Sequence, residues 1–217
     1  MRIPLAKYGA GQILLFGGVS LVGAAVTAFV FWYVAPLFTI GFLFVLYFFR
    51  DPSRRIPEEP GVVVSPADGK VVEVGEVDED AFLHAPAHKV AIFMSLLDVH
   101  VNRVPCDGRV EALVHRPGGY HNAATDAASR ENEALALVLA DVEGRTRILV
   151  RQVAGLVARR IVCDAAEGDR LVRGRRYGMI MFGSRLEVFV PVEANFEPAV
   201  GIGDSVRGGE TVLGWFR

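Results

Sequence analysis

The first fifty residues of the chain contain one long apolar run. No charged side chain occurs between Tyr8 and Phe49, and a single bilayer crossing needs only about 20 apolar residues. Pro36 lies near the middle of the run, where proline disfavours continuation of a helix. The pattern therefore predicts a helical transmembrane hairpin with one crossing at about 11–33 and a shorter one at about 37–49.

Basic residues flank this run on both sides. By the positive-inside tendency, both of its ends stay in the cytoplasm. Residues 1–50 are thus expected to anchor the chain in the cell (plasma or inner) membrane, with the rest on the cytoplasmic side. A single crossing is the alternative; a signal peptide fits poorly, because the run is too long and no small-residue cleavage site precedes its end. The flanking residues are Arg2 and Lys7 before the run and Arg50, Arg54 and Arg55 after it.

Residues 51–61 are dense in proline and charge, which predicts a surface linker. The arginines of this linker either contact lipid phosphates or serve only to set the topology of the anchor. The globular part is expected to begin at residue 62.

Residues 62–217 show short stretches with the two-residue alternation of half-buried strands, separated by glycine-containing turns. Only Gly119 to Glu133 departs from this pattern, and it predicts a short helix or a long loop. An all-β sandwich or barrel-like domain follows. The expected strands are Val71–Val77, Lys89–Leu96, Arg109–Val114, Leu135–Leu139, Thr146–Val150, Leu186–Val192 and Thr211–Trp215.

Two pairs of segments within this domain resemble each other. Residues 65–71 resemble residues 104–110, and residues 168–174 resemble residues 203–208. The second pair contains a Gly-Asp turn like that of biotinyl and lipoyl carrier domains. Those carriers present a modified lysine, and this chain has no lysine after Lys89. The turns can therefore share a shape with the carriers but not their function.

Composition adds little chemistry of its own. Apolar residues make up 52% of the 217 residues and the mean hydropathy is +0.34, but the excess belongs to the first fifty residues. A net charge of −2 argues against a nucleic-acid binder. Cys106 and Cys163 are expected to be buried free thiols in a reducing compartment. The five histidines lack the spacing of a zinc motif, so no metal is expected.

Three segments together indicate a function that none indicates alone. They are Pro66-Ala67-Asp68-Gly69-Lys70-Val71, the segment Ser95 to Gly108 with Asp98-Val99-His100, and Phe182-Gly183-Ser184 before the last strands. In this order, and with Phe48-Phe49-Arg50-Asp51-Pro52 at the membrane exit, the chain resembles the phosphatidylserine decarboxylase family in its short, membrane-anchored form.

The resemblance implies a pyruvoyl enzyme that makes its own cofactor. The chain would cleave itself between Gly183 and Ser184 into a β chain, 1–183, and an α chain, 184–217. Ser184 would become the pyruvoyl group, which forms a Schiff base with phosphatidylserine and takes up the electrons left when CO2 departs. The product would be phosphatidylethanolamine. The implied partners are the phospholipid in the membrane and the two chains themselves, and a homo-oligomer is allowed.

Roles for the other residues follow from the same resemblance. A serine hydroxyl needs a base, for which His100 is the candidate, with Asp68 orienting it as in a triad. Asp98 is the rival for that role, because residues two apart on a strand face the same side. After cleavage His100 would protonate the α-carbon. His121, in a glycine-rich loop, is expected to line the substrate entrance.

The chain departs from the best-known bacterial members at two places. They carry Leu-Gly-Ser-Thr at the cleavage point, where this chain has Phe182-Gly183-Ser184-Arg185, and the Gly-Ser core is intact. They also carry a second histidine three residues after the first, where this chain has Arg103. Any role of that second histidine cannot be transferred.

Three other functions compete with this interpretation. One is decarboxylation of a different serine-headed lipid. Another is a non-catalytic, membrane-tethered scaffold with a biotinyl-like fold, which would stay in one piece. The third is a serine hydrolase, which would keep the Ser184 hydroxyl and react with an organophosphonate probe.

Overall fold

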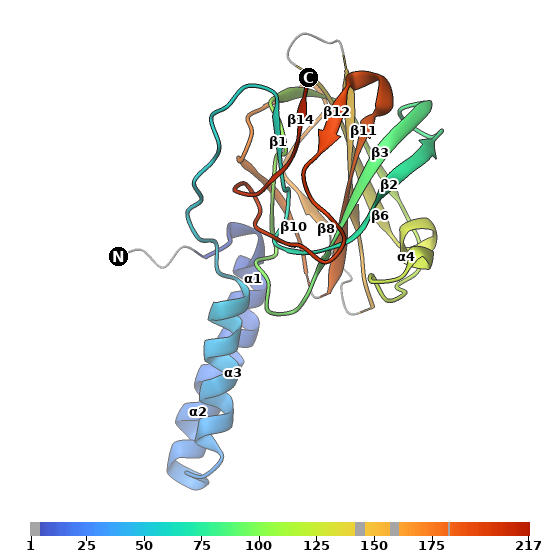
Figure 1. Ribbon diagram of the computed structural model, residues 1–217. Helices are drawn as coiled ribbons and strands as arrows, with labels where there is room; N and C mark the ends of the chain where they lie inside the picture. Colours follow the sequence, from blue (N-terminus) through green and yellow to red (C-terminus); the bar gives the residue numbers. More distant parts are fainter. Residues whose placement is uncertain (1–4, 142–145, 157–160, 182) are drawn as a thin grey trace. The chain divides into compact units, whose positions relative to one another are not determined.

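The computed structural model describes residues 5–141, 146–156, 161–181 and 183–217. The chain divides into two compact units, residues 1–53 and residues 54–217. The first contains helices and the second is almost entirely β-structure (Figure 1).

The first unit is a hairpin of two apolar helices. A continuous helical stretch from Lys7 to Val30 is long and apolar enough to cross a membrane, whereas the second helix is shorter. The two helices approach closely at Gly23, because a methyl group at that position would overlap the ring of Phe38. The elements are η1 (Lys7–Gly9), α1 (Ala10–Gln12), η2 (Ile13–Gly17), α2 (Gly18–Val30) and α3 (Ala35–Phe48).

The helix bounds lie within a few residues of those predicted. Pro36 occupies the first turn of α3, where its missing N–H group costs no hydrogen bond. It therefore separates the two helices, as the sequence indicated. Many large apolar side chains of this unit are exposed, Phe29 at 92% and Trp32 at 77% among them.

The second unit contains one large sheet and two small ones. The large sheet has eight strands in the order β13-β2-β3-β11-β7-β6-β5-β9, and its curling makes a half-barrel. The small sheets have the orders β1-β14-β12 and β4-β10-β8. The bounds are β1 Val62–Val64, β2 Gly69–Glu79, β3 Ala85–Met94, β4 Val101–Arg103, β5 Gly108–Arg116, α4 Asp126–Glu131, β6 Ala134–Ala140, β7 Arg147–Val153, β8 Ile161–Cys163, β9 Arg170–Leu171, β10 Arg176–Ile180, β11 Ser184–Pro191, η3 Val192–Ala194, β12 Phe196–Pro198, β13 Ser205–Val206 and β14 Val212–Phe216.

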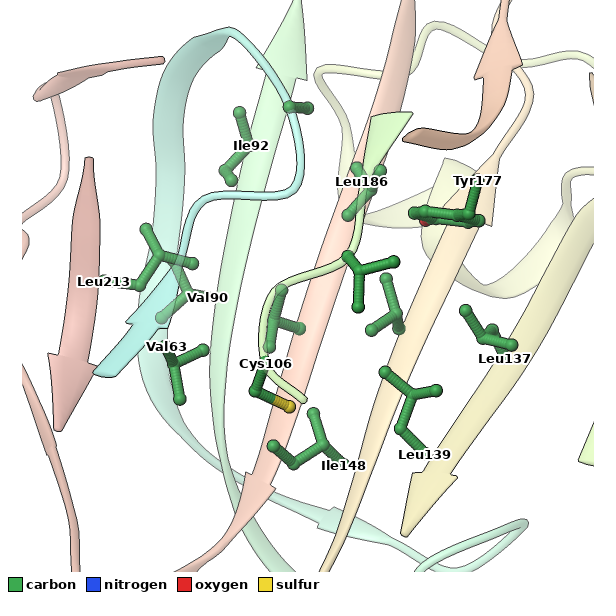
Figure 2. Packing of buried hydrophobic residues seen from close by; sticks show 14 of the residues in the cluster. Val63, Val90, Ile92, Cys106, Leu137, Leu139, Ile148, Tyr177, Leu186 and Leu213 are labelled. Atoms are coloured by element: carbon green, nitrogen blue, oxygen red, sulfur yellow. The ribbon is translucent and has the colours of Figure 1, made fainter. Parts of the chain in front are cut away.

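The core lies between the concave face of the large sheet and the small sheets. It is built from alternate residues of the central strands, among them Ile92, Ile148 and Leu186, which are at most 1% exposed (Figure 2). Tyr177 and Leu213 reach the same core from β10 and β14. Burial of these side chains stabilises the curl, because each contributes roughly 1.5–3 kcal/mol relative to exposure.

The two sequence echoes are structural repeats. Val71 and Val110 occupy equivalent places: each is the third residue of its strand and is followed by a bulge. Each N–H group donates to the carbonyl of an aspartate in a Gly-Asp turn, Asp204 at 2.9 Å and Asp169 at 2.9 Å. The half-barrel is therefore built from two related corners. The likeness of these corners to carrier domains stays a prediction.

The all-β prediction for the second unit is confirmed, and every predicted strand has a counterpart. The segment that departed from the strand pattern contains the short helix α4. The short strands β1, β4, β8, β9, β12 and β13 were not predicted, because two or three residues are too few to show a period. The five-residue strand β10 was also missed. Residues 54–61, predicted as linker, belong to the second unit.

Candidate active site

Ser184 is the first residue of β11, the strand at the centre of the large sheet. It pairs with Met94, the last residue of β3, in an antiparallel ladder. Its side chain is 0% exposed, and its hydroxyl lies 3.5 Å from the sulfur of Met94. Ser184 is therefore a buried hydroxyl at one end of the sheet, on the face that carries the core.

His100 lies six residues beyond Met94, between β3 and β4, and is also 0% exposed. Its Nδ1 is 2.9 Å from the carbonyl oxygen of Asp98. A carbonyl oxygen can only accept, so Nδ1 carries the proton and Nε2 of the neutral ring has a lone pair. The His100 carbonyl accepts from the N–H of Ile180, at the end of β10 and three residues before Gly183. The segment of His100 thus follows β3, which pairs with Ser184 of β11, and is hydrogen-bonded to the end of β10.

Asp98 supports this segment in two ways. Its carbonyl orients the ring of His100, while its carboxylate accepts from the N–H of Ser95 at 2.8 Å and from the hydroxyl of Ser95 at 2.7 Å. Asp98 orients the imidazole through its backbone carbonyl, and an orienting role for its carboxylate stays a prediction. A carboxylate role could be read from the sequence, but a carbonyl role could not, because every residue has a carbonyl.

Asp68 precedes β2 at the same end of the sheet, since Lys70 pairs with Phe93 next to Met94. Its carboxylate accepts from Arg54 at 2.7 and 2.9 Å and from the N–H of Gly208 at 2.8 Å. These contacts occupy Asp68 in the uncleaved chain. Its orienting role toward His100 stays a prediction.

Gly155 is a residue of the site that the sequence did not single out. A methyl group at this position would overlap the carbonyl oxygen of Gly183. Gly183 itself has φ +65°, in the left-handed region that favours glycine. The backbone of residue 155 therefore leaves the space in which the Gly183 carbonyl lies.

A buried amide pair was also missed. Gln152 donates to Oδ1 of Asn102 at 2.8 Å, and the amide of Asn102 is 3.9 Å from the sulfur of Met94. Both amides are at most 1% exposed. Oε1 of Gln152 is a buried acceptor with no hydrogen-bond partner in the described part of the chain. Two isolated amides on strands give no signal in the sequence, because only the fold places them beside Ser184.

The loop of His121 approaches the same end. Asn132 fixes it by accepting from the N–H of His121 at 2.7 Å and donating to the carbonyls of His121 and Ala154 at 2.9 and 2.7 Å. Ala154 directly precedes Gly155. His121 is about half exposed and pairs with Glu131 at 3.1 Å. Its place beside the site is compatible with an entrance role, which stays a prediction.

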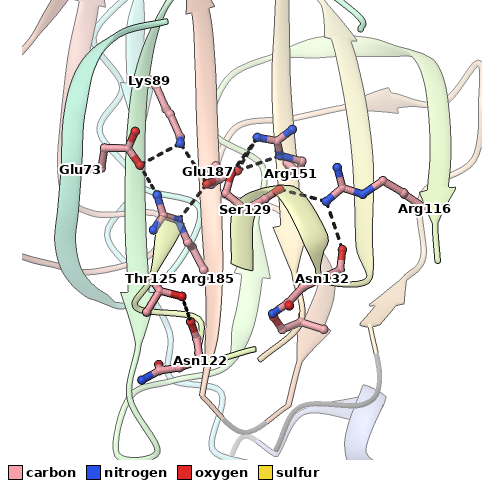
Figure 3. A network of polar contacts seen from close by, with 11 residues as sticks. Glu73, Lys89, Arg116, Asn122, Thr125, Ser129, Asn132, Arg151, Arg185 and Glu187 are labelled. Atoms are coloured by element: carbon pink, nitrogen blue, oxygen red, sulfur yellow. Dashed lines mark hydrogen bonds and ion pairs between the residues drawn. The ribbon is translucent and has the colours of Figure 1, made fainter. Parts of the chain in front are cut away.

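The opposite face of the sheet carries a network of charges (Figure 3). Glu187, 0% exposed, accepts from Arg185 and Arg151 at 2.8 Å each and lies 3.4 Å from Lys89. Glu73 completes the network through Arg185 and Lys89. Burial alone would raise the pKa of Glu187, but the three cations and a hydrogen bond from Ser129 bring it below its ordinary value.

Other candidate groups are less suited to chemistry. Burial, together with the charge of Asp107, raises the pKa of the Cys106 thiol to about 12, so this thiol stays protonated. A cleft lined by Arg109, Arg147 and acidic residues lies at the end of the sheet away from Ser184. Within the described ranges, no cluster of three potential metal ligands occurs. Phe182, part of the predicted cleavage motif, lies outside the described residues.

Comparison with known proteins decides the family. The model of the family described as phosphatidylserine decarboxylase matches residues 42–214. The chain belongs to the phosphatidylserine decarboxylase family. Similar decarboxylase relatives span almost the whole chain, and each is named phosphatidylserine decarboxylase proenzyme. One from Oleidesulfovibrio alaskensis is 45% identical over 90% of this chain and 88% of its own length. One from Desulfotalea psychrophila is 38% identical over 98% and 97%, and one from Cupriavidus pinatubonensis is 48% identical over 84% and 82%.

Membership in the decarboxylase family confirms the resemblance drawn from the three sequence segments. Arg103, at the position of the second histidine of the best-known members, is 5% exposed and donates to the carbonyl of Gly174 at 3.1 Å. In this chain the position therefore holds a buried structural cation.

Proposed function

We propose that this chain is a proenzyme that cleaves itself between Gly183 and Ser184 and then decarboxylates phosphatidylserine to phosphatidylethanolamine. The observation that carries the proposal is the family match over residues 42–214. The site supports it: a buried serine follows a glycine with positive φ, next to the segment of an oriented histidine.

Maturation uses groups of the chain and, in its last step, one water molecule. Nε2 of His100 takes the proton of the Ser184 hydroxyl, and the oxygen attacks the carbonyl carbon of Gly183. The C–N bond breaks as the amine takes up a proton, which converts the peptide bond into an ester. β-Elimination releases the carboxyl group of Gly183 and leaves a dehydroalanine, whose hydrolysis gives ammonia and the pyruvoyl group. The buried hydroxyl needs the imidazole because serine is a weak nucleophile at neutral pH.

The residues around Ser184 fit a pyruvoyl group of this origin. The group is no larger than the serine it replaces. It supplies the electron sink that decarboxylation of an amino acid requires. His100 then has a second task, to deliver a proton to the α-carbon. The amides of Asn102 and Gln152 are the buried polar groups available to position the head group.

The two products of cleavage are expected to stay together. The fragment 184–217 contains β11, which lies between β3 and β7 of the other fragment. It also contains β13 and β14, which pair with β2 and β1. Separation would break all of these ladders, so the matured enzyme is a complex of two chains.

The anchor fits a substrate that stays in the bilayer. We propose that the helical hairpin crosses the membrane twice, with the catalytic unit on the cytoplasmic side. Lys7–Val30 is long enough by itself. The shorter helix Ala35–Phe48 spans about 21 Å at 1.5 Å per residue, which requires local thinning or a shallow insertion.

Incubation with defined lipids tests this function. The purified, cleaved protein should convert phosphatidylserine to phosphatidylethanolamine with release of CO2, and a Ser184→Ala variant should not. Turnover of another serine-headed lipid, with phosphatidylserine left unchanged, would assign a different substrate. Uncleaved protein that reacts with an organophosphonate at Ser184 would indicate a hydrolase instead.

A further inference from the structure

A tight turn next to the active site presents two leucines to solvent. The N–H of Asp98 donates to the carbonyl of Ser95 at 3.1 Å, and the Asp98 carboxylate binds both the N–H and the hydroxyl of Ser95. Leu96 and Leu97 occupy the two central positions and are 45% and 62% exposed. Glycine, asparagine, aspartate and serine are the usual residues there. The turn is thus closed by polar contacts while its tip is apolar.

A third exposed leucine lies on the other side of Ser184. The strands β3 and β7 flank β11 and run antiparallel to it, so both end where β11 begins. Leu96 and Leu97 follow β3, and Leu156, 65% exposed, follows β7. Two strands separated by a third are about 10 Å apart. These three residues, which we name the leucine rim, therefore border the end of the sheet at which Ser184 lies.

The chain also enters the catalytic unit at this end. Arg54, the first residue of that unit, is bound by Asp68 directly before β2. β2 begins beside the end of β3, because Lys70 pairs with Phe93. The first residue of the catalytic unit thus lies at the end of the sheet that carries the rim.

We propose that the leucine rim inserts into the surface of the lipid bilayer and holds the Ser184 end of the sheet against the phospholipid head groups. This inference rests on the proposed function. A diacyl lipid keeps its acyl chains in the bilayer, so only the head group travels to Ser184, and the entrance must lie at the bilayer surface. Exposed apolar residues bordering such an entrance are favourable only when a lipid surface covers them.

Site-directed quenching tests the contact without relying on turnover. In a Cys163→Ala background, a fluorophore is attached to Leu97→Cys or Leu156→Cys in the full chain, reconstituted into phosphatidylcholine–phosphatidylglycerol vesicles. The control is Val172→Cys, because Val172 is 61% exposed and follows β9, which pairs with β5 at the opposite end of the sheet. Lipids with a quencher on the upper acyl chain should quench positions 97 and 156 but not 172. Equal quenching at all three positions, or no quenching at positions 97 and 156, would overturn the proposal. The absence of quenching at positions 97 and 156 would indicate that a protein partner covers the rim.

Turnover provides the second test. The Leu96→Ser/Leu97→Ser variant should mature normally and decarboxylate short-chain, monomeric phosphatidylserine at the wild-type rate. Its turnover of long-chain phosphatidylserine in vesicles should fall by about tenfold, because less apolar area is buried at the surface. Val172→Ser should match the wild type on both substrates. If the leucine variant lost turnover equally on both substrates, the role of the leucine rim would be overturned. If the rim positions were quenched but the wild type turned over neither substrate, only the proposed function would be contradicted.

Discussion

At the scale of single residues, the account depends on how the buried imidazole is held. The carbonyl of Asp98 accepts from Nδ1 of His100 and so orients the ring. We propose that Nε2 is the base of the cleavage step and that the same ring later acts as an acid. One residue would then serve two proton transfers separated in time.

Replacing His100 should impair both steps. General acid–base help is typically worth about 10²–10⁴-fold per step. His100→Ala should therefore cleave slowly or not at all, and any cleaved fraction should turn over poorly. The measurement is CO2 release per pyruvoyl group, titrated with a carbonyl reagent, and His115→Ala is the control, because His115 is an exposed partner of Glu133. Normal release per pyruvoyl would assign the second task to another residue, with His121 next.

Gly155→Ala should slow cleavage selectively. The added methyl group would displace the Gly183 carbonyl that Ser184 must attack, and we expect a loss on the order of 10²-fold, as for other misplaced reacting groups. After cleavage Gly183 becomes a free chain end and can move away. Turnover per pyruvoyl should therefore be near normal. Gly75→Ala is the matched control, since no atom lies within 4 Å of its added methyl group. Cleavage of Gly155→Ala at the wild-type rate would remove this residue from the site.

Asp68 has two competing roles that a pair of variants separates. If Asp68 supports the cationic state of His100, Asp68→Asn should slow cleavage more than Arg54→Gln does. If it only holds Arg54, both variants should lose similar stability and cleave alike. Cleavage half-times, measured beside thermal midpoints, decide between the roles.

Ser184, His100 and Gly183 could be predicted because nucleophile, base and cleavage turn depend on residue type. Gly155, Asn102 and Gln152 could not, because their effect comes from which backbone or side chain the fold places beside them. The carbonyl of Asp98 belongs to the same class.

At the scale of elements, β11 joins the reacting end to a buried charge network. Its alternate residues face opposite sides: Ser184 and Leu186 face the core, while Arg185 and Glu187 face the network. The long strands were predictable because their alternation spans enough residues. The network was not, since neighbouring Arg and Glu on a strand usually indicate a solvated face.

Glu187→Gln should lower stability near neutral pH. Removing one partner of a buried ion pair typically costs about 3–5 kcal/mol, because the cations lose their counter-charge. The pKa of Glu187 is lowered in the folded state, so its contribution is present above the ordinary carboxyl pKa and is lost as pH falls through the lowered value. Urea unfolding in a Ser184→Ala background should therefore show a difference between Glu and Gln that shrinks below about pH 4. A difference independent of pH would contradict the ionised state of Glu187.

At the scale of the whole molecule, the chain combines a helical unit with a β unit. The hydropathy pattern predicted the helical hairpin, and the two sequence echoes proved to be the related corners of the half-barrel. The curl of the sheet was not predictable, because it arises from bulges and from packing between distant strands.

The anchor predicts how the protein fractionates. The full chain should stay with membranes in high salt and in carbonate, whereas a chain lacking residues 1–49 should become soluble. Release of the full chain by carbonate would show that the helices lie on the membrane surface and do not cross it.

The most direct test of the central claim is the intact mass of the purified protein. The account predicts two polypeptides in place of the 23.6 kDa chain: residues 1–183, and residues 184–217 with a pyruvoyl group in place of Ser184 and a blocked N-terminus. Ser184→Ala should remain a single chain. A wild-type protein that keeps its full-length mass in detergent after long incubation would contradict the account.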